Sequence, residues 1–308
     1  MSLTAEELPS FKENGFLVRK AFAAKEEVKE MKEQMAKLLD GWNPEDSVDS
    51  VFSTERDQHI NNEYFTGSAD HIRFFLEPGA VNENGKIRSD IPKAELVNKV
   101  GHSLHVDDPV FRKYSTSRKV SEMVRDLGYK DPVLPQSMYI FKQPLIGGAV
   151  TSHQDSSFLH TTPRQTCLGM WLALDPATLE NGCLWVRPGS HREPLRRVFA
   201  RSTEEGSPHF VDVNMDIKAS PAVAWEGELP ASEGEGLRAK GFIPVEVDAG
   251  DLVVFPGTID HLSLPNTSPK QRHTYQLHLV EGPAAGITWS KENWLQYPAG
   301  KPFPSLRA

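Results

Sequence analysis

Apolar residues recur at steps of three and four between residues 25 and 42. This spacing places them on one face of a helix, and Gly41 supplies a stop. The members of this stripe are Val28, Met31, Met35, Leu38, Leu39 and Trp42. A second apolar stripe follows Asp107-Asp108-Pro109, a typical helix start, and ends at Gly128. The pattern predicts two amphipathic helices, each of which packs one face against a larger body.

Short elements surround these helices in the first part of the chain. Thr4 and Glu7 have the spacing of a capping box for an early short helix, and residues 15–19 are typical of a strand. We therefore expect residues 1–130 to be mainly helical support.

From about residue 133 the pattern changes to short β-branched and aromatic runs separated by Pro, Gly and Asn. These runs are residues 133–141, 167–173, 182–186, 242–247, 251–255, 261–264 and 273–280. Many short strands with such turns predict an all-β core with flanking helices (α+β), either a barrel or a two-sheet jelly roll. Residues 193–241, rich in Ser, Glu, Pro and Gly, are predicted to be an insertion over one face. We expect a single domain over residues 1–308, with its core in residues 131–297.

Candidate chemistry begins with His153 and Asp155, which are two positions apart. On a strand, residues i and i+2 share a face, so both side chains would point the same way and suit one metal ion, while Gln154 points away. The pair alone is a weak signal. A surface histidine beside a solvated acid is the simpler interpretation of H-x-D.

Residues 260–275 supply a second group of polar side chains. The segment has the pattern of strand, tight Pro/Asn/Ser turn and strand. If it is a hairpin centred on the turn, Ser263 faces Arg272 and His261 faces Thr274. All four would then share one face, and a barrel interior on that side would receive a third metal ligand together with a guanidinium and a hydroxyl.

Two histidines and one carboxylate with open positions suit non-haem Fe(II) oxygenases, and a nearby arginine suits the far carboxylate of 2-oxoglutarate. Other interpretations remain for the single residues. Arg272 could form a structural ion pair, and His261 could be a core histidine with both nitrogens hydrogen-bonded. The combination of H-x-D, a late-strand histidine and an arginine eleven residues further favours the iron site.

Charge and cysteine content limit the classes of binding partner and the cellular location that we expect. The 308 residues carry 34 Lys+Arg against 42 Asp+Glu, a net charge of −8, which argues against nucleic acid or an anionic membrane as a partner. No apolar run approaches the roughly 20 residues of a membrane helix. With two cysteines and a C-terminus unlike the S-K-L peroxisomal signal, a cytoplasmic, reducing location is expected.

Longer motifs surround these residues. They are QSMYIFKQP (136–144), HQD (153–155), GMWLALDPATLENGCLWVRPGSH (169–191) and GDLVVFPGTIDHLSLPNTSPKQR (250–272), with HIRFF (71–75), NKVGHSLHVDDPVF (98–111) and TWSKENWLQ (288–296) in addition. In these stretches the sequence resembles the phytanoyl-CoA dioxygenase family of Fe(II)/2-oxoglutarate oxygenases. The resemblance spans roughly residues 11–297 and implies a double-stranded β-helix. It also implies an iron site made of His153, Asp155 and His261, and a 2-oxoglutarate site made of Arg272, Ser263, Lys99, Met138 and Trp171.

The resemblance implies a dioxygenase that uses Fe(II), 2-oxoglutarate and O2 to hydroxylate an unactivated carbon of a small organic substrate, with release of succinate and CO2. Because related halogenases replace the carboxylate with a small residue, the retained Asp155 favours hydroxylation. The alternatives are a jelly-roll metal-binding or regulatory protein without turnover of a prime substrate, and a zinc hydrolase on the same ligands. Gln136 could orient either substrate.

The family's CoA thioester substrate is not carried over to this chain. Four arginines in or next to the predicted insertion could clamp a CoA phosphate, although a solvated basic loop is the simpler interpretation. They are Arg192, Arg196, Arg197 and Arg201.

Overall fold

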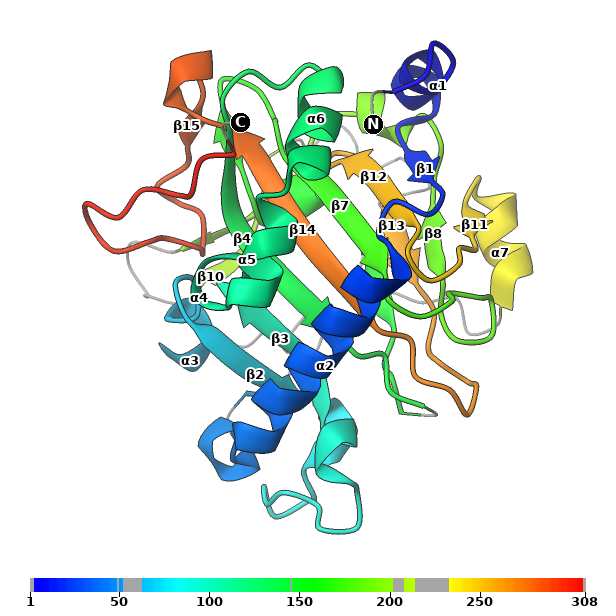
Figure 1. Ribbon diagram of the computed structural model, residues 1–308, viewed down its shortest axis with the longest axis vertical. Coiled ribbons are helices and arrows are strands. Elements are labelled where there is room, and N and C mark those ends of the chain that lie inside the picture. The colour runs from blue at the N-terminus through cyan, green and yellow to red at the C-terminus, as the bar shows by residue number, and fades with distance from the viewer. Residues whose placement is uncertain are drawn as a thin grey trace.

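The computed structural model describes residues 3–48, 50–51, 63–144, 146–201, 208–213 and 233–306. Two antiparallel sheets form its centre (Figure 1). The larger has seven strands in the order β1 (Leu17–Arg19), β12 (Leu252–Pro256), β7 (Leu168–Ala173), β14 (Thr274–Glu281), β4 (Pro132–Ile140), β3 (Val97–His102) and β2 (Ile72–Leu76). The smaller has the order β11 (Ile243–Val245), β8 (Leu184–Val186), β13 (His261–Ser263) and β5 (Val150–His153). The predicted jelly-roll core with flanking helices is confirmed.

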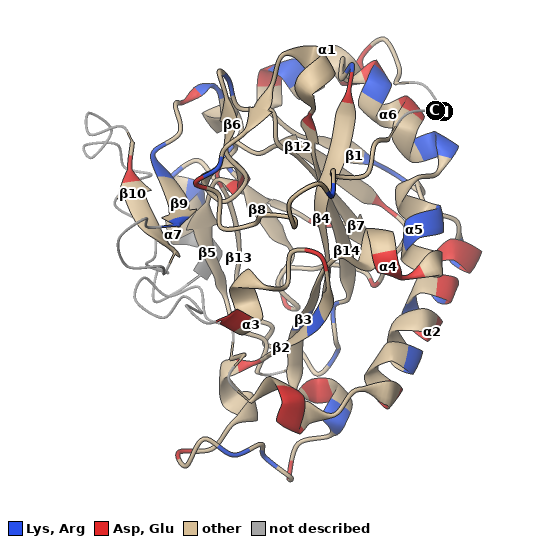
Figure 2. Ribbon diagram, turned by 90° about the vertical axis from the view of Figure 1, so that its left-hand side faces the viewer, with Lys and Arg blue, Asp and Glu red and all other residues tan. Residues whose placement is uncertain are grey.

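Helices cover the outer face of the larger sheet, where α2 (Lys25–Gly41), α5 (Pro109–Ser115) and α6 (Arg118–Asp126) cross it (Figure 1). Charged residues of both signs lie along the outside of these helices (Figure 2). The remaining α-helices are α1 (Glu7–Asn14), α3 (Glu63–Thr66), α4 (Leu104–Asp107) and α7 (Glu233–Ala239). The short 3-10 helices are η1 (Pro44–Ser47), η2 (Pro78–Ala80), η3 (Lys93–Glu95), η4 (Asp155–Ser157), η5 (Ser190–Arg192) and η8 (Pro283–Ala285). Among the described helices, none has the length and apolar content to cross a membrane.

The first predicted helix is confirmed, because α2 buries Val28, Met31, Met35 and Leu39. The capping box is present as well: Glu7 accepts from the Thr4 backbone N–H, and the Thr4 hydroxyl accepts from the Glu7 N–H. The second apolar stripe is divided between α5 and α6, since α5 ends at its C-cap Thr116 and Ser117 is the N-cap of α6.

The expectation of mainly helical support in residues 1–130 missed two strands of the larger sheet. β2 and β3 pair with each other, and β3 pairs with β4. The sequence of β3, VNKVGH, carries polar side chains toward an internal cavity and therefore lacks the alternation that marks a half-buried strand. The order of polar and apolar residues in β3 is set by the cavity that they line, and not by the two-residue period of a half-buried strand.

The predicted insertion, residues 193–241, lies only partly within the described residues. It contributes the two-stranded sheet of β9 (Arg197–Arg201) and β10 (Pro208–Asp212), and then α7. Residues 202–207 and 214–232 lie outside the part that the structure describes. A further small sheet joins β6 (Thr161–Thr162) to β15 (Thr288–Trp289).

The predicted hairpin over residues 260–275 is wrong. β13 pairs with β5 and β8 in the smaller sheet, whereas β14 pairs with β4 and β7 in the larger one. The intervening segment therefore passes from one sheet to the other instead of folding back on itself. Ser263 and Arg272 nevertheless line the same cavity, which lies between the sheets.

Acid sensitivity is expected from His105 of α4, which is buried and hydrogen-bonded through both ring nitrogens. Nε2 donates to the Leu134 carbonyl at 2.9 Å, and Nδ1 accepts from the Ser137 hydroxyl at 2.9 Å. Burial lowers the pKa of His105 to about 4. The unfolded chain, with a histidine pKa near 6.5, binds a proton that the folded protein excludes, so the free energy of unfolding falls as pH drops from about 6.5 toward 4.

Denaturant titrations of the apoprotein at pH 7, 6 and 5 check this expectation. Replacing His105 by Gln should make the fall in unfolding free energy shallower, by up to about 1.4 kcal/mol per pH unit. His71→Gln, at an imidazole whose side chain is 61% exposed, is the control and should leave the slope unchanged. Equal slopes for His105→Gln and the parent protein would contradict the assignment.

Candidate metal and co-substrate site

Three side chains that were predicted to act together converge between the sheets. His153, Asp155 and His261 each offer one ligand atom, and these atoms lie within 4.8 Å of one another. The Nε2 atoms of His153 and His261 are 3.4 and 3.5 Å from Asp155 Oδ1. Two imidazoles and a carboxylate gathered on one side of a point could hold a metal ion.

The backbone brings these residues together in two ways. His153 and His261 are directly paired across β5 and β13. Asp155, however, is not on the strand, because β5 ends at His153 and Asp155 opens η4. The predicted i, i+2 placement on one strand is therefore wrong for the carboxylate. A turn of the chain, rather than the strand pleat, returns Asp155 to the histidines.

Both imidazoles are oriented by backbone carbonyls. His153 Nδ1 lies 2.8 Å from the Thr151 carbonyl, and His261 Nδ1 lies 3.2 Å from the Ile259 carbonyl. A carbonyl oxygen can only accept, so Nδ1 carries the proton in each ring and the Nε2 lone pair is directed at the common point. This is the tautomer that metal binding requires.

Electrostatics favour the charge states of a metal site. Burial raises the pKa of Asp155, but the electrostatic influence of the neighbouring His261 and His278 rings and hydrogen bonds from His153 and His278 outweigh it and hold that pKa well below its usual range. Burial, followed by the neighbouring His153 ring, lowers the pKa of His261 to about 4. At neutral pH the cluster therefore holds an ionised carboxylate beside a neutral His261 imidazole.

His278 is a functional candidate that the sequence analysis missed. Its Nε2 lies 3.1 Å from Asp155 Oδ2, and its Nδ1 lies 3.2 Å from Gln136 Nε2. Alternation along β14 could have found it, because His278 lies six residues after Arg272 and thus on the same face. The predicted hairpin includes this face of the strand only as far as Thr274.

Arg272 lies in the same cavity as the three candidate ligands. Its guanidinium carbon is 5.2 Å from the Trp171 ring centre, and the residue is 2% exposed. Among the described residues no carboxylate forms an ion pair with it, and burial lowers its pKa to about 10. A buried cation without a protein anion is costly, which makes this end of the cavity a fitting place for an anionic ligand.

Ser263 and Lys142 stand beside this guanidinium end of the cavity. Lys142 Nζ donates to Ser263 Oγ at 2.8 Å and to the Gly148 carbonyl at 2.7 Å. Burial, followed by the charge of Arg272, lowers the pKa of Lys142 well below its usual range. Sequence reasoning missed Lys142, which the pattern does not distinguish from a surface lysine.

The remaining predicted residues also line this cavity, whose volume is about 170 Å³. Met138 and Trp171 lie on the inner face of the larger sheet, and both strands pair with β14 at Gln276. Lys99 is buried, with Nζ 5.0 Å from the Phe75 ring centre, and burial lowers its pKa to about 7. Gln136 lines the cavity beside His278.

Aromatic side chains form another part of the cavity wall. Phe158, Phe199 and Phe210 pack together with ring centres 5.0 to 5.5 Å apart, and Phe158 also contacts the His153 ring. Arg197 lies 3.6 Å from the Phe210 ring centre and lines the cavity as well. The described part of the predicted insertion therefore forms the wall next to the candidate ligands.

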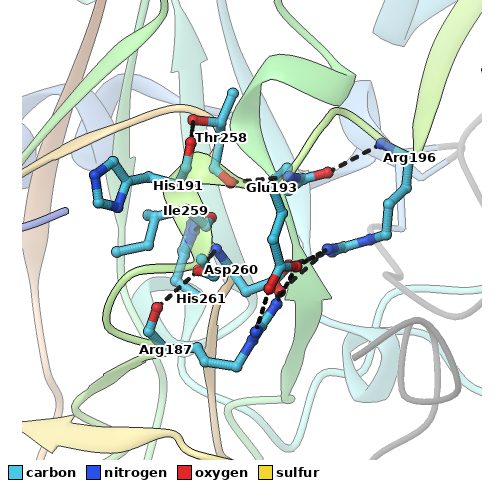
Figure 3. Close-up of polar contacts among 10 residues, drawn as sticks. Arg187, His191, Glu193, Arg196, Thr258, Ile259, Asp260 and His261 are labelled. Carbon is cyan, nitrogen blue, oxygen red and sulfur yellow. Dashed lines mark hydrogen bonds and ion pairs between the residues drawn. The ribbon is translucent and has the colours of Figure 1, made fainter. Parts of the chain in front are cut away.

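The interpretation as a solvated basic loop is wrong for Arg196 and Arg201, whereas Arg192 is exposed and donates to the Lys12 carbonyl. Arg196 is buried and pairs with Asp260, at 3.1 Å between Nη1 and Oδ2. Arg187 also pairs with Asp260, at 3.1 Å from Nε, and with Glu193. Figure 3 shows both guanidinium groups turned toward these carboxylates. Arg201 donates to the Trp294 carbonyl.

This ion-pair network stabilises the segment that carries His261. Asp260 is fully buried, its N–H donates to Ser190 Oγ at 2.9 Å, and its carbonyl accepts from the Arg187 N–H at 3.0 Å. Replacing Asp260 by Asn removes the anion shared by two arginines. Breaking a buried pair typically costs about 3–5 kcal/mol, so we expect the unfolding free energy to fall by roughly 3 kcal/mol.

Urea titrations of Asp260→Asn and of Asp248→Asn provide the comparison. The Asp248 side chain is 85% exposed, so its replacement should change the unfolding free energy by less than about 0.5 kcal/mol. An Asp260→Asn variant as stable as the control would show that the network does not support the fold.

Comparisons with known proteins agree with the fold. A family model described as Phytanoyl-CoA dioxygenase (PhyH) matches residues 11–274. The chain is 43% identical over 295 residues to Phytanoyl-CoA dioxygenase 1 of Oryza sativa subsp. japonica, covering 96% of this chain and 94% of that protein. It is 39% identical over 308 residues to Phytanoyl-CoA dioxygenase domain-containing protein 1 of Rattus norvegicus, covering 99% and 98%.

A solved structure with a similar fold is that of the epimerase SnoN in complex with Fe3+, alpha ketoglutarate and nogalamycin RO. Its TM-score is 0.61 at 14% sequence identity, and the match covers 98% of this chain and 97% of that one. On the family match and the identity to full-length relatives, the chain belongs to the phytanoyl-CoA dioxygenase (PhyH) family.

Proposed function

We propose that the protein is an Fe(II)- and 2-oxoglutarate-dependent dioxygenase. The observation that carries this proposal is the placement of Arg272, a buried cation with no carboxylate partner among the described residues, in the cavity that holds the His153, Asp155 and His261 cluster. Zinc hydrolysis on the same ligands would leave this arginine without a task. Bound Fe(II), together with 2-oxoglutarate and O2, supplies the oxidising chemistry.

The donor set fits Fe(II). His153 and His261 offer neutral Nε2 atoms, and Asp155 offers an ionised oxygen; two imidazoles and one carboxylate are the set used by non-haem Fe(II) oxygenases. Because these three side chains occupy one side of the site, positions remain for a chelating co-substrate and for oxygen.

The guanidinium end fits the far carboxylate of 2-oxoglutarate. Arg272 can pair with a carboxylate through two parallel hydrogen bonds, and Ser263 Oγ, which accepts from Lys142, can donate its own proton to the same group. Trp171, Met138 and Lys99 complete the walls that orient the co-substrate, in the roles that the family resemblance implied. Trp171 and Lys99 are buried, which excludes water from the reaction.

We further propose that the reaction hydroxylates an unactivated carbon of a small organic substrate, with release of succinate and CO2. The aromatic wall of Phe158, Phe199 and Phe210 would hold the apolar part of such a substrate next to His153. The retained Asp155 supports hydroxylation over halogenation, since the carboxylate fills the position that a halide would need.

The test is a comparison of small-molecule extracts before and after incubation with protein, Fe(II) and 2-oxoglutarate under 18O2. The expected result is a product that carries one labelled oxygen atom, accompanied by the formation of succinate. A His153→Ala variant should form neither the labelled product nor succinate. Loss of a metabolite at the same rate without oxygen would overturn the proposal in favour of hydrolysis. Iron binding with no oxygen uptake on any extract would favour a metal-binding protein.

A further inference from the structure

A short hydrogen-bonded chain on the inner face of the larger sheet ends at Asp155. Gln136 of β4 and His278 of β14 are paired across the two strands. Gln136 Nε2 is 3.2 Å from His278 Nδ1, and His278 Nε2 is 3.1 Å from Asp155 Oδ2. All three residues are buried, with at most 8% of their surface exposed. Neither Gln136 nor His278 belongs to the candidate ligand set.

The chemistry of the groups fixes the direction of the chain. An ionised carboxylate can only accept, so His278 Nε2 must carry a proton and donate it to Asp155. The Gln136 amide lies against the other ring nitrogen, Nδ1, at 3.2 Å. Gln136 therefore holds the imidazole in the orientation that directs Nε2 at Asp155.

The two oxygens of Asp155 consequently have different surroundings. Oδ1 is the atom within 3.4 to 3.5 Å of the His153 and His261 Nε2 atoms, while Oδ2 is turned toward His278. Gly169 of β7 keeps this pose open: a Cβ at that position would lie 3.2 Å from Asp155 Oδ2 and 2.8 Å from the Phe255 ring. A side chain here would clash with the Phe255 ring and crowd the carboxylate, so glycine leaves room for both.

We propose that His278, with its ring oriented by Gln136, is a positioning residue that holds Asp155 as a ligand through one oxygen only. By retaining Oδ2, His278 prevents the carboxylate from turning to present both oxygens, and so keeps a position free on the metal for co-substrate. This inference rests on the proposed function only in taking His153, Asp155 and His261 as the metal ligands. Outer partners of this kind commonly change metal affinity by about 10–100-fold.

The test uses Co(II) as a probe, because its visible spectrum reports the number and arrangement of its ligands. In His278→Phe, which keeps an aromatic ring but has no donor, Co(II) affinity should fall by about 10–100-fold and the visible spectrum should change. His278→Gln can place an amide NH2 near Asp155 Oδ2 and should restore most of both. Gln136→Leu should lower the affinity by a smaller factor, since the imidazole remains but its orientation is no longer fixed.

His105→Gln is the matched control, because it alters a buried imidazole on the outer side of β4 and should leave the Co(II) spectrum unchanged. Thermal unfolding of each apoprotein separates loss of fold from loss of the ligand. A parent protein that binds no Co(II) would contradict the proposed metal site itself. A parent protein that binds Co(II), with His278→Phe indistinguishable in affinity and spectrum, would overturn only the role of His278.

Discussion

Replacing Asp155 by Ala is expected to reduce Fe(II) affinity and 2-oxoglutarate-dependent succinate formation by more than the roughly 10–100-fold that is typical of changes around a metal site. The carboxylate is the only anion in the cluster, with Oδ1 facing both histidines. Without it, two neutral imidazoles remain to hold a divalent cation. His153→Ala and His261→Ala should have the same effect, since each removes one of the three ligands.

Anaerobic Fe(II) titration and a succinate assay measure these effects. Asp90→Ala is the matched control, because this aspartate is exposed and pairs with Arg88 at the surface. It should bind iron and form succinate as the parent protein does. Undiminished succinate formation by any of the three ligand variants would contradict the assignment of the metal site.

Arg272→Leu is expected to have opposite effects on function and on stability. It should raise the KM for 2-oxoglutarate or abolish turnover, because the far carboxylate loses its two-pronged partner. It should also stabilise the apoprotein, since the variant removes a buried cation that no described carboxylate neutralises. Replacing buried charged groups with apolar side chains of similar size is often neutral or stabilising by about 1–4 kcal/mol.

Arg272→Lys provides the graded comparison, because it keeps a cation but loses the planar fork. Its KM for 2-oxoglutarate should lie between those of the parent and the Leu variant. Steady-state kinetics and denaturant unfolding of the apoproteins measure the two effects separately. If Arg272→Leu destabilised the apoprotein and left the KM unchanged, Arg272 would be a structural residue and the co-substrate site would lie elsewhere.

Much of the fold could be predicted because its signals are local. The stripe of α2 and the short β-branched and aromatic runs of β4, β7, β12 and β14 are visible within windows of a few residues. β3 could not be recognised in this way, because its Asn98, Lys99 and His102 line a cavity. A strand whose inner face binds ligand loses the apolar period that would reveal it.

The gathering of the candidate site residues could be predicted, but not their geometry. His153, Asp155 and His261 lie together and Arg272 lines the same cavity. A 3-10 turn, however, delivers Asp155, and a crossover between sheets, instead of a hairpin, separates His261 from Arg272. The alternation of side chains along one strand can be predicted even when the pairing of that strand is wrong. Pairing between strands depends on residues that are distant in the sequence. The same reason explains why His278 and Lys142 were missed.

The insertion shows how surface patterns can mislead. Arg196 lies in a polar, basic stretch of the sequence. In the folded protein its guanidinium is buried and pairs with the carboxylate of Asp260, which is sixty-four residues away in sequence. Only the folded chain brings that anion to the arginine. The network places β9, which carries the cavity residues Arg197 and Phe199, against the segment that ends at His261.

Anaerobic titration of the apoprotein with Fe(II) and then 2-oxoglutarate, followed by air and a succinate assay, tests the central claim most directly. The account predicts a visible charge-transfer band when 2-oxoglutarate is added, succinate after air is admitted, and weakening of both in an Arg272→Ala variant. Bound iron with no band and no succinate would contradict it, leaving a metal site without an oxygenase.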